Sequence, residues 1–364
     1  MGVTFIEIEA SGSHRDIGRR IGEAARELIA DGLAHCEEHH EAMGGPPFAV
    51  ARRLAIEYLS AARAALPGVV DELEGMAEGA GVPLDALLVP NLGEEFTCND
   101  DPGAEATTSA PRSAHAGHCT SVALHSDGRV LMGHNEDWFA GEIERNVLLR
   151  ITTDDGTRIL AMTSACLLPP SGINSHGIAT SGNTVYANDH RSGVPNNLLR
   201  RHMLEARSLA DARERALLAG RARGSNHLVA HASGELWDIE TSSSHDALLT
   251  STDRLIHTNH YLSPEMAPFE ISTSVGTRQR LARAGELLDE GLARGEDPRD
   301  VLAALLSDHE GLEDDVSICG HPNPAVPVGE REATTASMIW DLRELTVEVC
   351  AGPPCRSDRR LIRL

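Results

Sequence analysis

Apolar side chains recur through the first ninety residues at intervals that suit amphipathic helices. Within residues 15–34, they fall every three or four positions, which places them on one face of a helix. Before these helices, residues 6–10 alternate apolar and acidic side chains, as a strand with one buried face does. This part of the chain is therefore predicted to form one strand followed by helices at 15–34, 48–65, 69–80 and 84–88.

The period changes to two after residue 119, and turn residues separate the alternating stretches. Ser126-Asp127-Gly128 and Asp154-Asp155-Gly156 are each flanked by apolar alternation, which is typical of β-hairpins. The predicted strand pairs are 122–124 with 130–132, 147–151 with 159–161, 227–231 with 235–240, and 337–342 with 346–350. Further helices are expected at 196–207, 209–219, 277–293 and 298–306. This succession of helices, antiparallel strands and helices predicts an α+β architecture with layered sheets.

The charge balance and the cysteines bear on partners and compartment. The 364 residues carry 55 acidic and 32 basic side chains, a formal net charge of −23, so nucleic acids and anionic membranes are not expected to bind. There is no run of about eighteen apolar residues, and the first ten residues lack the features of a secretory signal. The seven cysteines are scattered without a C-x-x-C pair. We therefore expect a cytoplasmic protein with reduced thiols, and a homo-oligomer is compatible with the sequence.

Cys119 has a sequence context that the other cysteines lack. It heads an alternating run, and the segment from Thr97 to Ala116 before it is poor in large apolar residues. Such a segment is typical of an exposed linker in which a chain can be cut. A cut before Cys119 would leave a thiol and a free amine, with a pKa of about 8, on one residue, as in the N-terminal-nucleophile hydrolases. The alternative is a buried structural cysteine at the start of a core strand.

Two further polar residues could serve a reaction at Cys119. The hairpin returns Asp137 toward Cys119, where its carboxylate could orient the new amine. Asn259 ends another apolar-flanked strand, and its amide could donate a hydrogen bond to an oxyanion, a contribution on the order of 3 kcal/mol. The alternative for both is a polar residue that caps a local turn. Thr120 and Trp138, next to these positions, are candidates for binding the substrate.

Other kinds of catalytic site find less support in the sequence. His35 and His39 lie four residues apart and would share a helix face, but they lack the H-E-x-x-H order and an evident third ligand. Solvated histidines at a polar helix end are the preferred interpretation, and neither a metal ion nor a bound cofactor is expected. The chain contains no G-x-S-x-G nucleophile elbow, phosphate loop or dinucleotide fingerprint.

Four segments in a characteristic order suggest a family. They are Cys119-Thr120-Ser121-Val122-Ala123, Gly133-His134-Asn135-Glu136-Asp137-Trp138, Thr258-Asn259-His260 and Thr335-Ala336-Ser337-Met338-Ile339-Trp340-Asp341-Leu342, with a weaker match at Asn91-Leu92-Gly93-Glu94-Glu95-Phe96. Together they resemble the isopenicillin-N acyltransferase family, which includes acyl-coenzyme A:6-aminopenicillanic acid acyltransferase and the carcinine hydrolases. The resemblance covers most of the chain.

The resemblance implies a four-layer αββα N-terminal-nucleophile hydrolase fold with an N-terminal helical segment, made as an inactive precursor, or zymogen. By this analogy the precursor cuts itself before Cys119. Residues 1–118, which end in a cleavable linker at 97–118, would become one chain. Residues 119–364, which carry the catalytic core, would become the other, and the two would stay together as one domain.

The resemblance also implies the chemistry. Cys119 would attack an amide or thioester carbonyl while Asp137 positions its amine and Asn259 helps to stabilise the oxyanion. The acyl group would then pass from Cys119 to water or to an amine. The implied activity is therefore that of an amidohydrolase or N-acyltransferase, with no cofactor and with acyl-CoA as a candidate co-substrate.

Two positions depart from the family pattern. His118 stands before the nucleophile, where the family commonly has glycine, so an uncleaved, non-catalytic binding relative of the same fold is the alternative function. Family members also use a late arginine in the site. Arg331, shortly before the last strand pair, is the predicted one, with Arg278 and Arg280 as alternatives.

The expected substrate is a small-molecule amide, thioester or amine. The many acidic side chains of the chain favour one that is cationic or carries an amine.

Overall fold

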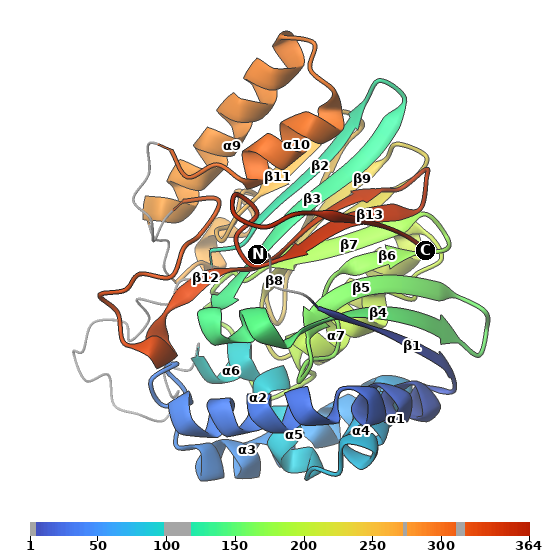
Figure 1. Ribbon diagram of the computed structural model, residues 1–364, viewed down its shortest axis with the longest axis vertical. Helices are drawn as coiled ribbons and strands as arrows, with labels where there is room; N and C mark the ends of the chain where they lie inside the picture. Colours follow the sequence, from blue (N-terminus) through green and yellow to red (C-terminus); the bar gives the residue numbers. More distant parts are fainter. Residues whose placement is uncertain (1–4, 98–117, 272–274, 311–316) are drawn as a thin grey trace.

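Two β-sheets stacked on each other form the centre of the protein, and helices cover the outer face of each (Figure 1). The computed structural model describes residues 5–97, 118–271, 275–310 and 317–364. In spatial order, the eight-stranded sheet contains β1 (Ile6–Gly12), β4 (Asn146–Thr153), β5 (Arg158–Ser164), β6 (Gly172–Asn174), β7 (Ile178–Asn183), β8 (Ser225–His231), β9 (Leu236–Thr241) and β10 (Asp246–Ser251). The six-stranded sheet contains β11 (Arg254–His257), β2 (Thr120–Ser126), β3 (Arg129–Phe139), β12 (Glu332–Asp341), β13 (Thr346–Ala351) and β14 (Arg360–Arg363).

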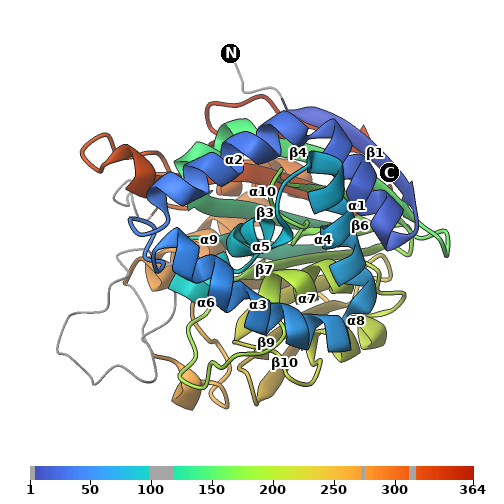
Figure 2. The same ribbon diagram turned by 90° about the horizontal axis from the view of Figure 1, so that it is seen from below.

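The helices fall into groups on the outer faces of the two sheets. They are α1 (His14–Ala24), α2 (Arg26–His39), α3 (Phe48–Ala65), α4 (Pro67–Ala80), α5 (Leu84–Asn91), α6 (Gly93–Thr97), α7 (Asn196–Met203), α8 (Leu209–Ala216), α9 (Val275–Ala293) and α10 (Pro298–Leu306). Seen from below in Figure 2, α1 to α5 lie in front of the strands. At the opposite side of the molecule, α9 and α10 cover the six-stranded sheet (Figure 1). Among the described residues, no helix is long and apolar enough to cross a membrane.

Successive side chains along each strand point to opposite faces of its sheet, and apolar side chains on both faces hold the layers together. Leu148 from the eight-stranded sheet and Met132 and Met338 from the six-stranded sheet belong to one buried cluster between the sheets. Residues of the opposite parity in the same sheets face the helices, as Val147 does on one side and Val122 on the other. Because both faces of each sheet are buried, the protein forms four layers in the order helix, sheet, sheet, helix. The predicted αββα fold class is confirmed.

The predicted helix over 15–34 is two helices. The chain bends at Ala25, where φ is −103° and ψ is 14°, so α1 ends and α2 begins there. Helix α1 packs closely on α4, since a Cβ at Gly18 would lie 1.8 Å from the backbone oxygen of Glu72. Helix α2 instead approaches a different part of the protein, where Gly32 lies against the Cys166 sulfur. The bend therefore lets each half pack on its own partner. The helices predicted at 48–65 and 69–80 are confirmed as α3 and α4.

The hairpin of β2 and β3 forms as predicted. Ser126 pairs with Arg129, and the two turn residues Asp127 and Gly128 have φ values of 50° and 73°. Positive φ at both central positions is typical of the type I′ turn, which Asp-Gly favours. Near the start of the described chain, β1 pairs in parallel with β4. Elements from both sides of residues 98–117 therefore share one sheet and one hydrophobic core.

Candidate active site

Cys119 lies immediately before β2, facing the far end of β3. The ladder pairs Thr120 with Asn135, so the next pair in register brings Cys119 to Glu136. The Cys119 sulfur accepts a hydrogen bond of 3.3 Å from the backbone N–H of Asp137 and lies 3.7 Å from Glu136 Oε1. The structure thus brings together Cys119 and Asp137, as the hairpin in the sequence predicted. Burial raises the pKa of the Cys119 thiol well above its usual value, and the negative charges of Glu136 and Asp137 add to this effect.

The carboxyl group of Asp137 is buried beside Cys119. Asp137 is 3% exposed and pairs with Thr334 of β12. Burial raises its pKa to about 8, although the Thr334 hydroxyl and the Arg280 guanidinium oppose part of this shift. Neither carboxylate oxygen of Asp137 has a hydrogen-bond partner among the described residues. The Thr334 hydroxyl is near the carboxylate, but not in hydrogen-bond geometry with it. The ionised form of such a buried carboxylate is stabilised most strongly by a cationic hydrogen-bond donor at short distance.

We expect Asp137 to make the uncut chain less stable as the pH rises. Its pKa is about 8 in the folded chain and near 3.8 in the unfolded chain. Between these values the unfolded chain binds fewer protons, so the free energy of unfolding falls as the pH rises from about 4 to about 8. In a Cys119→Ala background, Asp137→Asn should therefore raise the melting temperature at pH 8 and have a smaller effect at pH 5.

The matched control for this prediction is Asp341→Asn. The Asp341 carboxylate lies 3.1 Å from Arg129, so its charge is paired and its loss should lower the melting temperature. Melting curves between pH 5 and 8 measure both effects. An Asp137→Asn variant whose melting temperature follows the pH in the same way as its parent would contradict the raised pKa of Asp137.

Asn259 reaches the same end of the sheet from β11. The pairing of His257 with Ser121 places Asn259 level with the start of β2. One amide hydrogen of Asn259 goes to the Thr184 carbonyl at 3.0 Å, and its oxygen accepts a hydrogen bond of 2.7 Å from Arg280. These bonds fix the orientation of the amide.

Arg280 comes from α9 and is fully buried. Burial lowers the pKa of its guanidinium to about 10, while the nearby Asp137, Cys119 and Glu332 act in the opposite direction. Arg331, the arginine predicted from the sequence, instead donates to the backbone carbonyls of Val326 and Pro324 at 2.8 and 3.2 Å. It lies where the chain enters β12, with its guanidinium turned to this backbone. The geometry therefore favours Arg280 over Arg331 as the arginine of the site.

The third candidate, Arg278, is also on α9 but is exposed, 3.5 Å from Glu270. His118, on the other side of the proposed cut, is half-buried, and its Nδ1 lies 3.3 Å from Glu332. Thr120 is fully buried, and its hydroxyl has no hydrogen-bond partner among the described residues. Most of the linker predicted at 97–118 lies outside the described residues, as does Cys98.

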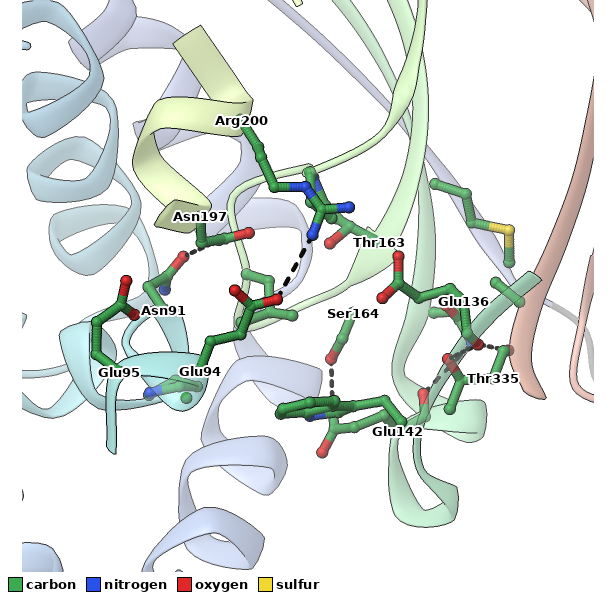
Figure 3. A pocket seen from close by; sticks show the side chains of 18 residues that line it. Asn91, Glu94, Glu95, Glu136, Glu142, Thr163, Ser164, Asn197, Arg200 and Thr335 are labelled. Atoms are coloured by element: carbon green, nitrogen blue, oxygen red, sulfur yellow. Dashed lines mark hydrogen bonds and ion pairs between the residues drawn. The ribbon is translucent and has the colours of Figure 1, made fainter. Parts of the chain in front are cut away.

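Figure 3 shows a pocket of about 700 Å³, open mouth included. Its lining residue Glu136 lies 3.7 Å from the Cys119 sulfur. Trp138, a candidate from the sequence for binding the substrate, is among the residues that line this pocket. Figure 3 also shows Glu94, Glu136 and Glu142 around the space, with Arg200 directed toward Glu94. A second pocket of about 520 Å³, lined largely by apolar residues, shares Trp138 and Glu142 with the first. In the sequence, Glu136 stood in the motif at residues 133–138 and Glu94 in the weaker match at residues 91–96, whereas no motif indicated Glu142.

The charge of the pocket depends on buried arginines. Burial acts to raise the pKa of Glu94, but Arg223 and Arg200 outweigh it and lower that pKa. Burial raises the pKa of Glu95 to about 7, and the adjacent Glu94 adds to this effect. Glu136 has a lowered pKa because His134, 3.2 Å away, outweighs its burial. Glu94 and Glu136 are therefore negatively charged at neutral pH.

Residues 124–356 match the sequence profile of the acyl-coenzyme A:6-aminopenicillanic acid acyl-transferase family. The chain belongs to this family. The resemblance predicted from the motifs is thereby confirmed. One relative, the 40 kDa form of acyl-coenzyme A:6-aminopenicillanic-acid-acyltransferase from Emericella nidulans, is 24% identical over 351 residues, which cover 88% of this chain and 94% of that protein. Membership supports acyl transfer as the class of reaction.

The solved structures that the chain matches include a mutant of the conjugated bile acid hydrolase from Clostridium perfringens. It is 12% identical, covers 68% of this chain and 97% of its own, and has a TM-score of 0.46. Penicillin V acylase from Agrobacterium tumefaciens is 13% identical, covers 64% of this chain and 82% of its own, and has a TM-score of 0.40.

Proposed function

We propose that the protein cuts itself before Cys119 and then cleaves or transfers acyl groups at amide bonds through an acyl-Cys119 intermediate. The observation that carries the proposal is the convergence of Cys119, Asp137 and the Arg280–Asn259 pair beside a pocket. Family membership supports the same class of reaction. The roles of the individual residues follow from their chemistry.

The α-amino group of a cut Cys119 would act as the base. It takes the thiol proton as the sulfur bonds to the substrate carbonyl carbon, and it returns a proton to the departing amine. Asp137 is the proposed partner of this amino group, because its carboxylate is buried and its negative charge acts on the Cys119 thiol. An ammonium–carboxylate pair would favour the ionised form of Asp137 and would hold the amine beside the sulfur.

Asn259 is the proposed oxyanion donor. One of its amide hydrogens goes to Thr184, and the other can serve the oxygen that becomes negative when sulfur attacks the carbonyl. Arg280 keeps the amide in this orientation through its bond to the Asn259 oxygen. Its positive charge near Cys119 also stabilises negative charge that develops during the reaction.

Self-cleavage would use the same sulfur. Cys119 attacks the carbonyl carbon of His118, the peptide nitrogen leaves as the new α-amino group, and water hydrolyses the resulting thioester. The imidazole of His118, 3.3 Å from Glu332, would keep this partner during the step. After the cut, residues 1–118 and 119–364 would remain one domain, because β1 pairs with β4 and the two parts share a core.

The two pockets suggest a substrate with unlike ends. The pocket beside Glu136 carries negative charge at Glu94 and Glu136, which suits a cationic or amine-bearing group. The adjoining apolar pocket suits the hydrocarbon part of an acyl group. A small amide, with acyl-CoA as an alternative acyl donor, fits this division.

A cytoplasmic location is part of the proposal. The six cysteines that the structure describes are all free thiols, which suits a reducing compartment. A nucleophilic cysteine also needs to remain reduced to react with a carbonyl.

Intact-mass spectrometry of the purified protein tests the proposal. We expect two chains divided between His118 and Cys119 under denaturing conditions, and one particle containing both under native conditions. The Cys119 chain should gain the mass of one acyl group when the reaction is quenched with acid. A chain that stays whole and takes up no acyl group would instead favour a non-catalytic binding protein.

Glu136→Gln is expected to weaken selectively the binding of cationic substrates. Loss of one charge that faces the ligand should raise the KM for a cationic amide about five- to tenfold, or about 1 to 1.4 kcal/mol, relative to its neutral isostere. Any change in the reactivity of Cys119 affects both substrates, so the ratio of their KM values isolates the charge effect. An unchanged ratio would exclude Glu136 from recognition of the amine. Glu144→Gln, a residue outside the pocket lining, is the control.

A further inference from the structure

Four metal-ligating side chains meet at the end of the six-stranded sheet, and the proposed catalysis uses none of them. They are His309, Cys319, His321 and Cys355, and one donor atom from each lies within 4.8 Å of those of all the others. The Nε2 atom of His321 is 3.7 Å from the Cys319 sulfur and 3.3 Å from the Cys355 sulfur. The rings of His309 and His321 meet edge to face, with centroids 5.2 Å apart.

We propose that these four residues bind a structural zinc ion. Two thiolates and two imidazoles are a common ligand set of closed, tetrahedral zinc sites. Bond lengths of about 2.3 Å to sulfur and 2.0 Å to nitrogen place a sulfur and a nitrogen ligand roughly 3.6 Å apart in a tetrahedron. The two sulfur–nitrogen distances at His321 bracket this value. The soft sulfur ligands favour zinc over magnesium or calcium.

The backbone already holds part of this cluster. The N–H of Cys319 donates to the carbonyl of Asp308 at 2.9 Å, which fixes Cys319 next to the segment that carries His309. Cys319 and His321 are buried, whereas His309 and Cys355 are exposed. A metal ion can therefore reach the site from solvent without crossing the core. Binding would require only small side-chain movements, since the donor atoms are already close together.

The three segments that would share the ion are remote in sequence. His309 follows α10, Cys319 and His321 precede β12, and Cys355 follows β13. Zinc would thus join the outer helical layer to the C-terminal part of the sheet. An ion that binds this folded arrangement and not the unfolded chain is expected to raise the free energy of unfolding.

The link would also brace the wall of the active site. Asn135 donates to the Ile318 carbonyl at 2.8 Å, and the N–H of Thr334 donates to the Gly320 carbonyl at 3.1 Å. Thr334 is the strand partner of Asp137. The segment that carries two of the zinc ligands therefore rests on the strands that hold Asp137. The role assigned to zinc is structural, and none of its ligands lies in the pocket lining.

Zinc content tests this inference. Protein purified without a histidine tag and dialysed against metal-free buffer should retain about one zinc ion per chain by plasma mass spectrometry. Cys319→Ser with Cys355→Ser should reduce the content to less than about a tenth of an ion. Cys36→Ser, which alters a buried cysteine of α2 outside the cluster, should keep the full content. The Cys119→Ala variant should also keep it, so the result does not depend on the proposed catalysis.

Cobalt substitution provides a second measurement. Cobalt(II) in the wild-type protein should give the visible bands of a tetrahedral site and a sulfur-to-cobalt charge-transfer band, and the double variant should lack the latter. Should the double variant fail to fold, His309→Ala alters only an exposed ligand and should weaken zinc binding at least about tenfold. A folded wild-type protein that binds no zinc, or one in which peptide mapping finds a Cys319–Cys355 disulfide, would overturn the proposal.

Discussion

Cys119→Ala should give a single uncut chain of 364 residues without measurable amide-cleaving activity. The variant lacks the sulfur that the proposal uses both to cut the chain and to form the acyl-enzyme. Removal of a covalent nucleophile from a hydrolase lowers kcat by roughly 10⁶-fold, and the loss here is expected to be at least about 10³-fold. Intact mass and a coupled assay of amine release measure the two effects on the same sample.

Cys350→Ala is the matched control for this variant. Cys350 is also buried at a strand of the six-stranded sheet, but it lies in β13 and contacts the Gly352 carbonyl. This variant should be cut and should keep its activity, even where the small cavity lowers its melting temperature. If the wild-type protein were whole and the Cys119→Ala variant as active as the wild type, the thiol would have no catalytic role.

Arg280→Met should lower kcat/KM by about 10²- to 10³-fold, the range found when an oxyanion donor is lost. The guanidinium of Arg280 holds the Asn259 amide through a hydrogen bond of 2.7 Å and lies close to Asp137 and Cys119. Methionine fills much of the same space but leaves the Asn259 oxygen without this donor, which costs about 1 to 3 kcal/mol of stability when the group stays buried. The loss should fall mainly on kcat, because Arg280 is proposed to act on charge in the transition state.

Arg331→Met separates the two arginine assignments. Its guanidinium donates only to backbone carbonyls of a neighbouring turn among the contacts described, so kcat/KM should change by less than about threefold. Arg280→Lys keeps the positive charge but not the planar fork, and it should recover part of kcat. A larger loss for Arg331→Met than for Arg280→Met would restore Arg331 as the arginine of the site.

Local sequence signals predicted the elements that need few distant partners. The hairpin of β2 and β3 follows from Asp127-Gly128, since both residues adopt the positive φ that its turn requires. Helix α3 was predicted with both ends correct, and Leu66-Pro67 interrupts the helical pattern where it ends. The approach of Asp137 to Cys119 was predictable for the same reason, as a two-residue turn fixes the register of both strands.

Elements that depend on distant neighbours were harder to predict. The bend at Ala25 has no glycine or proline to mark it, and it reflects the different surfaces on which α1 and α2 pack. Strands β6 and β14 have three and four residues, too few for alternation to be distinctive. They exist because a neighbouring strand offers them hydrogen bonds.

The sequence by itself determined the family, the layered α+β architecture and the position of the reactive-looking cysteine, because each depends on patterns within short stretches. Only the tertiary structure decided which arginine meets Asn259, since α9 delivers Arg280 across the sheet while Arg331 lies beside its own turn. The same holds for the pocket that Glu94 and Glu136 line and for the four side chains of the proposed zinc site. Their side chains come from segments far apart in the chain, and long-range packing alone sets the distances between them.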